Sequence, residues 1–166
     1  KPYGYAGLGD LSVFVFFGFV GVCGTYFLQA YSHVPTWTQA LPWPVLLPAA
    51  ALGCFATAVL NVNNIRDIRS DKLAGKITIP VRLGPVRARR YHWLLLALGL
   101  AAAVLYVAFT YRSPWQWLFL LSAPLLLRNA RAVWQRQDSR QLDPLLKQMA
   151  LTTLIFTLLF GLGQVL

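Results

Sequence analysis

Apolar residues fill most of this chain in long runs, and short polar segments separate the runs. From residue 11 to residue 65 the sequence contains no Asp, Glu, Lys or Arg. A helix needs about 20 apolar residues to cross the hydrocarbon core of a bilayer, so this run is too long for one crossing and fits two joined by a short turn. Further apolar runs follow residue 90. The pattern predicts an all-α, polytopic membrane protein.

We predict five membrane spans from these runs. A segment rich in helix breakers, including Ser32, Pro35 and Pro42, separates the first two. The fourth is apolar only as far as Leu127 and should finish as an amphipathic helix through Trp134. The predicted spans cover residues 11–31, 43–61, 91–111, 115–127 with its amphipathic extension, and 148–166.

Composition supports insertion into a membrane. Hydrophobic residues make up 57% of the chain and charged residues 12%, and the charged share is about half that of an ordinary globular protein. The six tryptophans lie close to the ends of the predicted spans, where aromatic belts form at membrane–water interfaces. Small residues, such as Gly53 and Gly99, are typical of closely packed membrane helices.

The net charge of +10 is concentrated in two of the connecting segments. Residues 66–90 hold eight Lys or Arg against two Asp, and residues 128–147 hold five against two. The segment 32–42 holds none, and Arg112 is alone in its connection. The positive-inside rule therefore predicts both basic loops in the cytoplasm, the first residue inside and the last outside. Nucleic-acid binding is disfavoured because the basic residues flank spans, and the arginines after residue 127 are suited to anionic lipid.

The first basic loop also carries a cluster of oxygen side chains. Asn63, Asp67 and Asp71 recur every fourth residue, so on a helix they stack along one face. Such side chains hold hard cations like Mg²⁺, which commonly bridge to phosphate oxygens. Three cations suited to a diphosphate follow in the same segment: Lys72, Lys76 and Arg82. The same pattern also fits a solvated helix end laced with ion pairs.

Other residue types point to no further chemistry. Cys23 and Cys54 each lie within a predicted span and have no partner at metal-ligand spacing, so we expect them to be small packing residues. His33 and His92 have no nearby Cys, Glu or second His, which disfavours a zinc or haem site. Asp10 fits equally a helix cap and a functional acid.

The motif residues resemble those of a known family. Residues 63–71, followed by Gly-Lys-Ile-Thr at 75–78 and Val-Arg-Leu-Gly at 81–84, resemble the second aspartate-rich motif of the UbiA superfamily of intramembrane prenyltransferases. Upstream, residues 2–10 and 24–29 match as well. Within the superfamily, the paired Asn and the Gly-Lys tail are most similar to the branch that acts on 1,4-dihydroxy-2-naphthoate.

This resemblance implies a fold of nine transmembrane helices around a central cavity. The five spans here would be the last five, with the motif on the cytoplasmic side. Family members carry two aspartate-rich motifs, and only the second is present in this sequence. The sequence also begins with Lys1 within a loop-like segment. We therefore expect residues 1–166 to form the C-terminal part of one transmembrane domain, without the first motif.

The resemblance also implies a reaction and its residues. A polyprenyl diphosphate would bind through Mg²⁺, ionise, and transfer its prenyl group to 1,4-dihydroxy-2-naphthoate with loss of the ring carboxylate. The product would be demethylmenaquinone, made at the bacterial cytoplasmic (inner) membrane for menaquinone synthesis. Asp67 and Asp71 would be catalytic and would bind the metal together with Asn63. The residues expected to bind the diphosphate are Lys76, Arg82 and Lys72.

The resemblance places two further groups at the cavity. Asn64, Tyr3 and Tyr5 would lie on the acceptor side or at its mouth. Aromatic residues of the first span are candidates for the prenyl channel as a group: Phe14, Phe16, Phe17, Phe19, Tyr26 and Phe27. Two alternatives stay open. The protein is a superfamily enzyme with another aromatic acceptor, or it is a non-catalytic membrane subunit whose basic loops bind anionic lipid.

Overall fold

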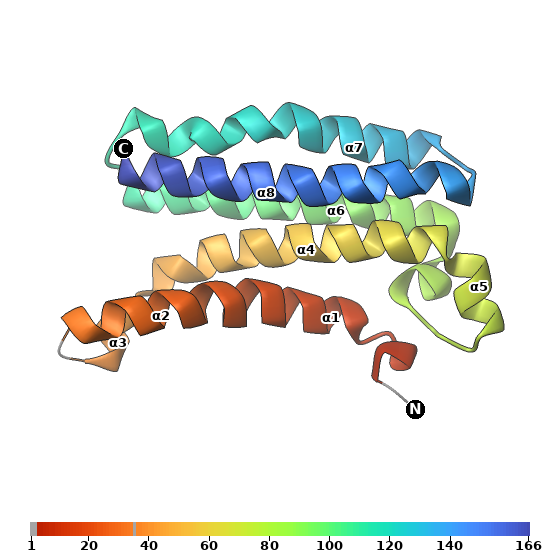
Figure 1. Cartoon of the computed structure of the whole chain (residues 1–166), viewed down its shortest axis with the longest axis horizontal. Coiled ribbons are helices and arrows are strands. Elements are labelled where there is room, and N and C mark those ends of the chain that lie inside the picture. The colour runs from red at the N-terminus through yellow and green to blue at the C-terminus, as the bar shows by residue number, and fades with distance from the viewer. Residues whose placement is uncertain (1–2, 35) are drawn as a thin grey trace.

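A computed structural model describes residues 3–34 and 36–166, without the side chains of Tyr3, Ala6 and Trp37. Each described element is a helix, and the long helices run side by side along one axis (Figure 1), as predicted for an all-α bundle. In chain order the elements are η1 (Tyr3–Ala6), α1 (Gly9–Val13), η2 (Phe14–Cys23), α2 (Gly24–Ala30), η3 (Tyr31–His33), α3 (Trp37–Ala40), η4 (Trp43–Val45), α4 (Leu46–Arg66), α5 (Ile68–Leu73), α6 (Ile79–Thr110), η5 (Pro114–Ser122), α7 (Ala123–Gln135), η6 (Ser139–Leu142) and α8 (Asp143–Val165).

Four helical passes among the described residues are long and apolar enough to cross a membrane: Gly9–His33, Trp43–Arg66, Ile79–Thr110 and Ser139–Val165. Each covers nearly all of one predicted span and extends beyond it. The first pass is α-helical only near its ends, because η2 is a π-helix, a helix type that the sequence did not predict. The third is kinked at Gly84, whose φ of 75° is not helical.

The fourth predicted span forms η5 and α7, which lie against α8 (Figure 1). This pass is not among the four apolar ones. Its second half exposes Arg128 and Arg131, in agreement with the amphipathic extension that the sequence predicts. The described residues therefore form five antiparallel passes. Four are apolar enough to cross a membrane by themselves, and the pass of η5 and α7 also relies on its contacts with α8 and α6.

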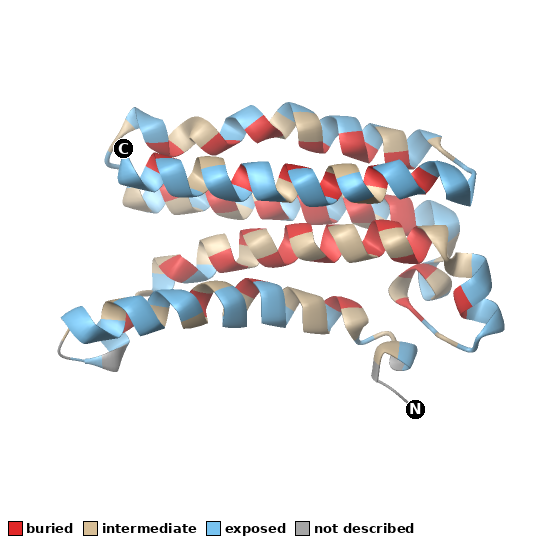
Figure 2. Ribbon diagram, viewed as in Figure 1, coloured by how far each residue is buried: buried red, intermediate tan, exposed pale blue. Residues whose placement is uncertain are grey.

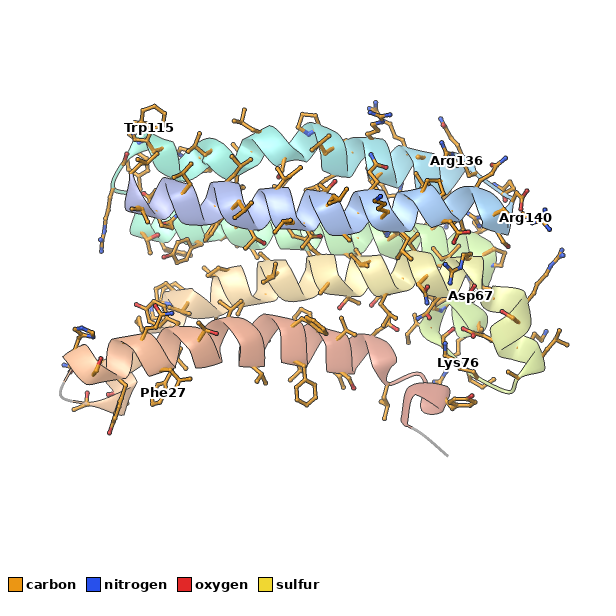
Figure 3. All side chains as sticks on the ribbon, viewed as in Figure 1. Phe27, Asp67, Lys76, Trp115, Arg136 and Arg140 are labelled. Carbon is orange, nitrogen blue, oxygen red and sulfur yellow. The ribbon has the colours of Figure 1, made fainter. Side chains whose placement is uncertain are left out.

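The two basic loops lie at the same end of the bundle. Figure 1 shows the N-terminal segment, α5 and the connection from α7 to α8 together at one end, and the other connections with the C-terminus at the opposite end. In Figure 3, Asp67, Lys76 and Arg140 lie at this first end and Phe27 and Trp115 at the other. We call the first end the basic end. The predicted alternation of basic and uncharged connections is thus present in the fold.

Helix α4 lies at the centre and carries much of the buried surface (Figure 2). It packs against η2 on one side and against α6 and α8. The contact with η2 is close enough to require glycine: a Cβ on Gly53 would lie 2.8 Å from the Phe14 carbonyl oxygen, and one on Gly18 would lie 2.6 Å from that of Ala49. Gly99 of α6 packs directly on the Phe55 ring. The small residues therefore set the spacing between helices, as predicted.

Buried polar contacts join α6, α7 and α8. The His92 Nε2 atom lies 3.0 Å from the Asn129 amide oxygen, and since that oxygen only accepts, the ring nitrogen donates. The Asn129 amide nitrogen donates to the Leu145 carbonyl at 3.0 Å and to the Gln148 side chain at 3.2 Å. Because polar groups within a membrane bundle need internal partners, this network fixes the three helices in one register.

A buried arginine completes this region. The Arg89 guanidinium donates to the carbonyl oxygens of Val133 and Arg136, each at 2.9 Å, and to that of Pro85 at 3.0 Å. The first two carbonyls belong to the C-terminal end of α7, where helical carbonyls lack intrahelical donors. Arg89 therefore caps α7 from a neighbouring helix.

The packing of η2 on α4 can be tested at Gly53. A Gly53→Ala substitution should lower the free energy of unfolding by about 1–3 kcal/mol, because the added methyl meets backbone atoms that cannot move away. Gly161→Ala is the matched control, since a Cβ there meets nothing within 4 Å. Thermal unfolding of the complete protein in detergent measures both, and equal melting temperatures for the two variants would contradict this account.

Candidate functional site

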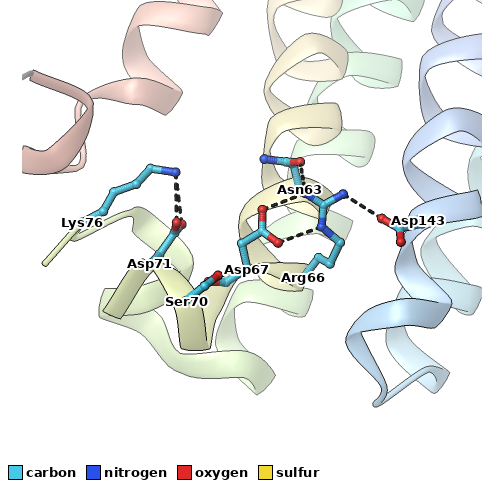
Figure 4. Close-up of polar contacts among 7 residues, drawn as sticks. All are labelled: Asn63, Arg66, Asp67, Ser70, Asp71, Lys76 and Asp143. Carbon is cyan, nitrogen blue, oxygen red and sulfur yellow. Dashed lines mark hydrogen bonds and ion pairs between the residues drawn. The ribbon is translucent and has the colours of Figure 1, made fainter. Parts of the chain in front are cut away.

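The oxygen cluster lies where α4 ends. Helix α4 stops at Arg66, Asp67 has φ −97° and ψ 10°, and α5 begins at the next residue. The backbone hydrogen bonds still follow the helical pattern, since the Asp67 amide donates to the Asn63 carbonyl at 3.1 Å and the Asp71 amide donates to the Asp67 carbonyl at 2.8 Å. The single helical face that the spacing predicts is therefore interrupted at Asp67, and its side chains separate into two groups (Figure 4).

Arg66 organises the first group. Its Nε and Nη2 atoms donate to the two carboxylate oxygens of Asp67 at 2.8 and 2.7 Å, and Nη2 also donates to the Asn63 amide oxygen at 2.8 Å. Its Nη1 atom reaches Asp143, at the start of α8, at 2.7 Å (Figure 4). The hydrogen bonds from Arg66 hold the pKa of Asp67 below its usual value. Asp67 is therefore an oriented carboxylate in its ionised form.

Asp71 and Lys76 form the second group, and a helix C-cap brings them together. The Lys76 amide donates to the Asp71 carbonyl at 2.8 Å and the Gly75 amide to the Lys72 carbonyl at 3.2 Å, the two bonds of a Schellman motif. The motif needs a residue with positive φ, and Gly75 has φ 69°. Its closure brings the Lys76 Nζ atom within 3.2 Å of both carboxylate oxygens of Asp71 (Figure 4).

The other two predicted diphosphate ligands lie apart from each other. Lys72 is exposed on α5. The Arg82 guanidinium lies against the N-terminal segment, since a Cβ on Gly7 would be 3.2 Å from its Nε atom. A backbone hydrogen bond of 3.0 Å from the Ile77 amide to the Tyr5 carbonyl joins the same two segments. The structure thus brings Lys76 and Arg82 towards the N-terminal segment and directs Lys72 outward.

A cavity of about 400 Å³ opens between the N-terminal segment, α4 and the loop before α6, and we call it the polar cavity because several charged, amide and hydroxyl side chains line it. Its lining residues are Gly4, Tyr5, Gly7, Gly9, Asp10, Ser12, Val13, Leu60, Asn64, Lys76 and Thr78. Two of the sequence-predicted cavity residues, Asn64 and Tyr5, are among them, and the side chain of Tyr3 lies outside the described residues. Asn64 is 2% and Asp10 6% exposed. One side-chain oxygen of each has no hydrogen-bond partner within the described part of the chain.

Asp10 makes no capping bond at the start of α1, so of its two predicted roles the structure does not show the cap. Its unpartnered oxygen and that of Asn64 are acceptors beside a cavity. Because a buried acceptor without a donor is costly, they are suited to a ligand that carries hydroxyl or amide hydrogens.

An apolar pocket of about 480 Å³ lies next to this cavity, between η2, α4 and α8. Its lining residues are Val13, Phe17, Ala56, Val59, Leu60, Asn63, Leu146, Ala150 and Thr153. Among the aromatic residues predicted for a prenyl channel, Phe17 lines it. Phe14 and Phe19 instead pack on each other with ring centroids 5.4 Å apart, and Phe27 stacks on Tyr31 at 5.2 Å. The walls of the pocket are mostly apolar, and its two polar lining residues are Asn63 and Thr153.

The donor set fits a hard divalent cation that is shared with a substrate. No group of three or more His, Cys, Asp or Glu that could hold a metal occurs among the described residues. The oxygens of Asn63, Asp67 and Asp71 nevertheless match Mg²⁺, which commonly uses one or two carboxylates and completes its shell with substrate phosphates and water. They do not form a closed protein cage.

Sequence reasoning missed the structural partners of this cluster. The sequence pattern alone assigns Arg66 no role beyond a solvated ion pair, whereas in the structure Arg66 orients Asn63 and Asp67 together. Asp143 is one of the two acids in the other basic loop, and it accepts the hydrogen bond from the Arg66 Nη1 atom. A signal was present, because acids are rare in this chain and Asp143 starts a helix at the same end of the bundle.

Comparison with known proteins places these features in a family. The UbiA prenyltransferase family model matches residues 1–162. The 1,4-dihydroxy-2-naphthoate octaprenyltransferase of Escherichia coli is 48% identical over 163 residues, which are 98% of this chain and 50% of that protein. The enzyme of the same name from Mycobacterium tuberculosis is 43% identical over 159 residues, covering 95% of this chain and 50% of that protein.

A more distant relative, the 2-carboxy-1,4-naphthoquinone phytyltransferase of Synechocystis, is 27% identical over 139 residues, covering 81% of this chain and 41% of that protein. No solved structure matches. This chain spans about half the length of the curated relatives described above. The family model covers almost the whole chain and the relatives agree with it, so the chain belongs to the UbiA prenyltransferase family.

Proposed function

We propose that the complete protein transfers a polyprenyl group from a polyprenyl diphosphate to 1,4-dihydroxy-2-naphthoate with decarboxylation, forming demethylmenaquinone. The observation that carries this proposal is that Asn63, which shares the Arg66 guanidinium with the Asp67 carboxylate, lines an apolar pocket. Lys76, which pairs with Asp71, lines the neighbouring cavity. The acceptor rests on relatives at 43 and 48% identity that are named for 1,4-dihydroxy-2-naphthoate. A superfamily enzyme with another acceptor is the alternative.

The chain's polar residues would stabilise the leaving diphosphate. Departure of an allylic diphosphate is fast only where its growing negative charge meets preorganised positive groups. Lys76 and Arg82 supply two of these, with Lys72 a third at the surface. Asn63, Asp67 and Asp71 would hold Mg²⁺, which when bound neutralises phosphate charge. Arg66 keeps Asp67 ionised and oriented for that role.

In this proposal each of the two hollows binds one substrate. The apolar pocket beside Asn63 takes the prenyl chain and keeps water from the allylic carbon, because water would capture a cation formed there. The polar cavity takes the aromatic acceptor, where the unpartnered oxygens of Asn64 and Asp10 accept hydrogen bonds from its hydroxyl groups. Tyr5 lies at the same cavity. Lys76 lines this cavity and pairs with Asp71, so it lies between the acceptor and the diphosphate.

The multi-pass fold and the charge distribution give the proposed setting. The basic end faces the cytoplasm of a bacterial cell, with the chain in the inner membrane and its last residue outside. The first aspartate-rich motif of the family would come from the part of the complete protein that this chain does not cover, and residues 1–166 would form one domain with that part.

A product assay tests the reaction and the acceptor together. Membranes that contain the complete protein are incubated with a polyprenyl diphosphate and 1,4-dihydroxy-2-naphthoate, with and without Mg²⁺. The products are identified by mass spectrometry. We expect a decarboxylated prenyl product that requires the metal. Transfer to a different aromatic acid alone would discard the acceptor and keep the reaction class. Absence of prenyl transfer to any aromatic acceptor would favour a non-catalytic membrane subunit.

An Asp67→Asn substitution tests the metal role. We expect the rate to fall by roughly 10²–10³, as for other preorganised electrostatic groups, while the protein still inserts into the membrane. Asp138→Asn is the matched control, because Asp138 lies in the other basic loop and its side chain caps η6, a role that Asn also fulfils. A wild-type rate for Asp67→Asn would exclude this carboxylate as a metal ligand.

The turn that positions Lys76 gives an independent test. Gly75→Ala forces a side chain into a backbone conformation with positive φ, which costs about 1 kcal/mol and should shift Lys76 from Asp71, lowering the rate about fivefold. Gly75→Asn should lose less, because Asn tolerates this conformation better than Ala. If both variants lose activity equally, the turn geometry is not the cause.

A further inference from the structure

A groove runs between α6 and α7 and shares no residue with the two hollows of the candidate site. It consists of three adjoining hollows. The first has about 400 Å³ and is lined by Arg90, Trp93, Arg131, Trp134 and Gln135. The second has about 410 Å³ and is lined by Pro124, Leu127, Arg128, Arg131, Ala132 and Gln135. The third has about 200 Å³ and is lined by Trp93, Leu96, Ala97, Leu100, Ala123, Leu126, Leu127 and Ala130.

Shared lining residues show that the three hollows adjoin. Arg131 and Gln135 line both the first and the second hollow, Trp93 lines the first and the third, and Leu127 lines the second and the third. We call the whole feature the α6–α7 groove. Arginine side chains therefore line one end of the groove and apolar side chains line the other.

The arginines of this groove lack protein partners. Within residues 3–34 and 36–166, no hydrogen bond or ion pair engages the guanidinium groups of Arg90, Arg128 or Arg131. Arg89 and Arg136, by contrast, donate to backbone carbonyl oxygens. No acidic residue lines any of the three hollows. The positive charge of the groove is thus available to an external anion.

The polarity of the groove changes along both helices in the same direction. On α6, Arg90 and Trp93 lie nearer the basic end and Leu100 lies towards the other end. On α7, Trp134, Arg131 and Arg128 lie nearer the basic end, and the groove residues that precede Arg128 are apolar. Tryptophan in a membrane protein favours the headgroup level. The arginines therefore lie at headgroup depth and the apolar hollow at acyl-chain depth.

We propose that the α6–α7 groove binds an anionic phospholipid, with its phosphate on Arg90 and Arg131 and an acyl chain in the apolar hollow. Basic pockets between transmembrane helices on the cytoplasmic side suit such headgroups. A polyprenyl diphosphate has similar polarity, but its transfer calls for a hard cation, and no carboxylate lines this groove. The carboxylates lie instead at Asp67 and Asp71. The groove is a lipid site separate from the reaction.

Lipid titration of the complete, delipidated protein in detergent, followed by native mass spectrometry, tests the proposal. We expect phosphatidylglycerol and cardiolipin to bind at least tenfold more tightly than phosphatidylcholine. Inorganic diphosphate at millimolar concentration should leave them bound, because it lacks the acyl chain. Displacement by inorganic diphosphate would overturn the lipid assignment in favour of a simple phosphate site. Displacement by an equimolar polyprenyl diphosphate would assign the groove to the substrate.

Two pairs of variants locate the site. Arg90→Gln with Arg131→Gln removes two groove charges and should weaken phosphatidylglycerol binding about thirtyfold. Arg69→Gln with Arg87→Gln removes two exposed charges of the basic end that line none of the hollows of the groove, and should leave the affinity near wild type. Equal weakening by both double variants would show a diffuse charge effect and overturn the proposal.

The second pair keeps all charges. Ala97→Trp fills the apolar hollow and should abolish retention of long-chain phosphatidylglycerol. Ala101→Trp places the same exposed bulk one turn along α6, outside the groove, and should have no effect. Retained lipid in Ala97→Trp would show that no acyl chain occupies the hollow. Because both positions are exposed, these variants test the site even if the arginine variants fold poorly.

Discussion

The guanidinium of Arg66 is the interaction on which the geometry of the basic end depends. It is the point where the end of α4, the oxygen cluster and the start of α8 meet, through Asn63, Asp67 and Asp143. An arginine suits this role because its planar fork can engage several acceptors at once and stays charged. Without it, two carboxylates and an amide near the end of a membrane bundle would have neither fixed orientation nor compensating charge.

The close packing of helices supplies the complementary constraint. Glycines at the η2–α4 contact and at the contact of α6 with Phe55 bring backbones together. Buried hydrogen bonds from Asn129 and Arg89 then hold α7 in place. The two hollows of the candidate site lie along α4, so the most deeply packed helix also positions the residues proposed for the reaction. The close packing of α4 thus both stabilises the core and fixes the positions of the site residues.

Much of the fold could be predicted from the sequence because a bilayer leaves few choices. Runs of apolar residues, the alternation of charge and the small residues gave the passes, their order and their closest contacts. These properties are local, or they follow from composition, and spacing along the chain encodes them directly. The position of Asn64 and Tyr5 at one cavity is an expectation of the family resemblance and not of spacing.

The remaining features depend on distant residues or on small backbone energies. The spacing predicted one helical face that carries Asn63, Asp67 and Asp71. In the structure α4 ends before Asp67, so Asp67 pairs with Arg66 whereas Asp71 pairs with Lys76. The bond from Arg66 to Asp143 joins residues far apart in sequence, and only the packing of α8 on α4 brings them together. The π-helical conformation of η2 is a further example. A similar limit applies to the aromatic set, of which Phe17 alone lines the apolar pocket.

The polar side chains of α7 have a consequence for how the protein enters its membrane. This helix is not apolar enough to be stable alone in lipid, and its Asn129 amide and C-terminal carbonyls find their partners on α6 and α8. Unsatisfied polar groups in hydrocarbon are costly. Helix α7 therefore depends on α6 and α8 for the partners of its polar groups, which ties the insertion of these three segments to one another.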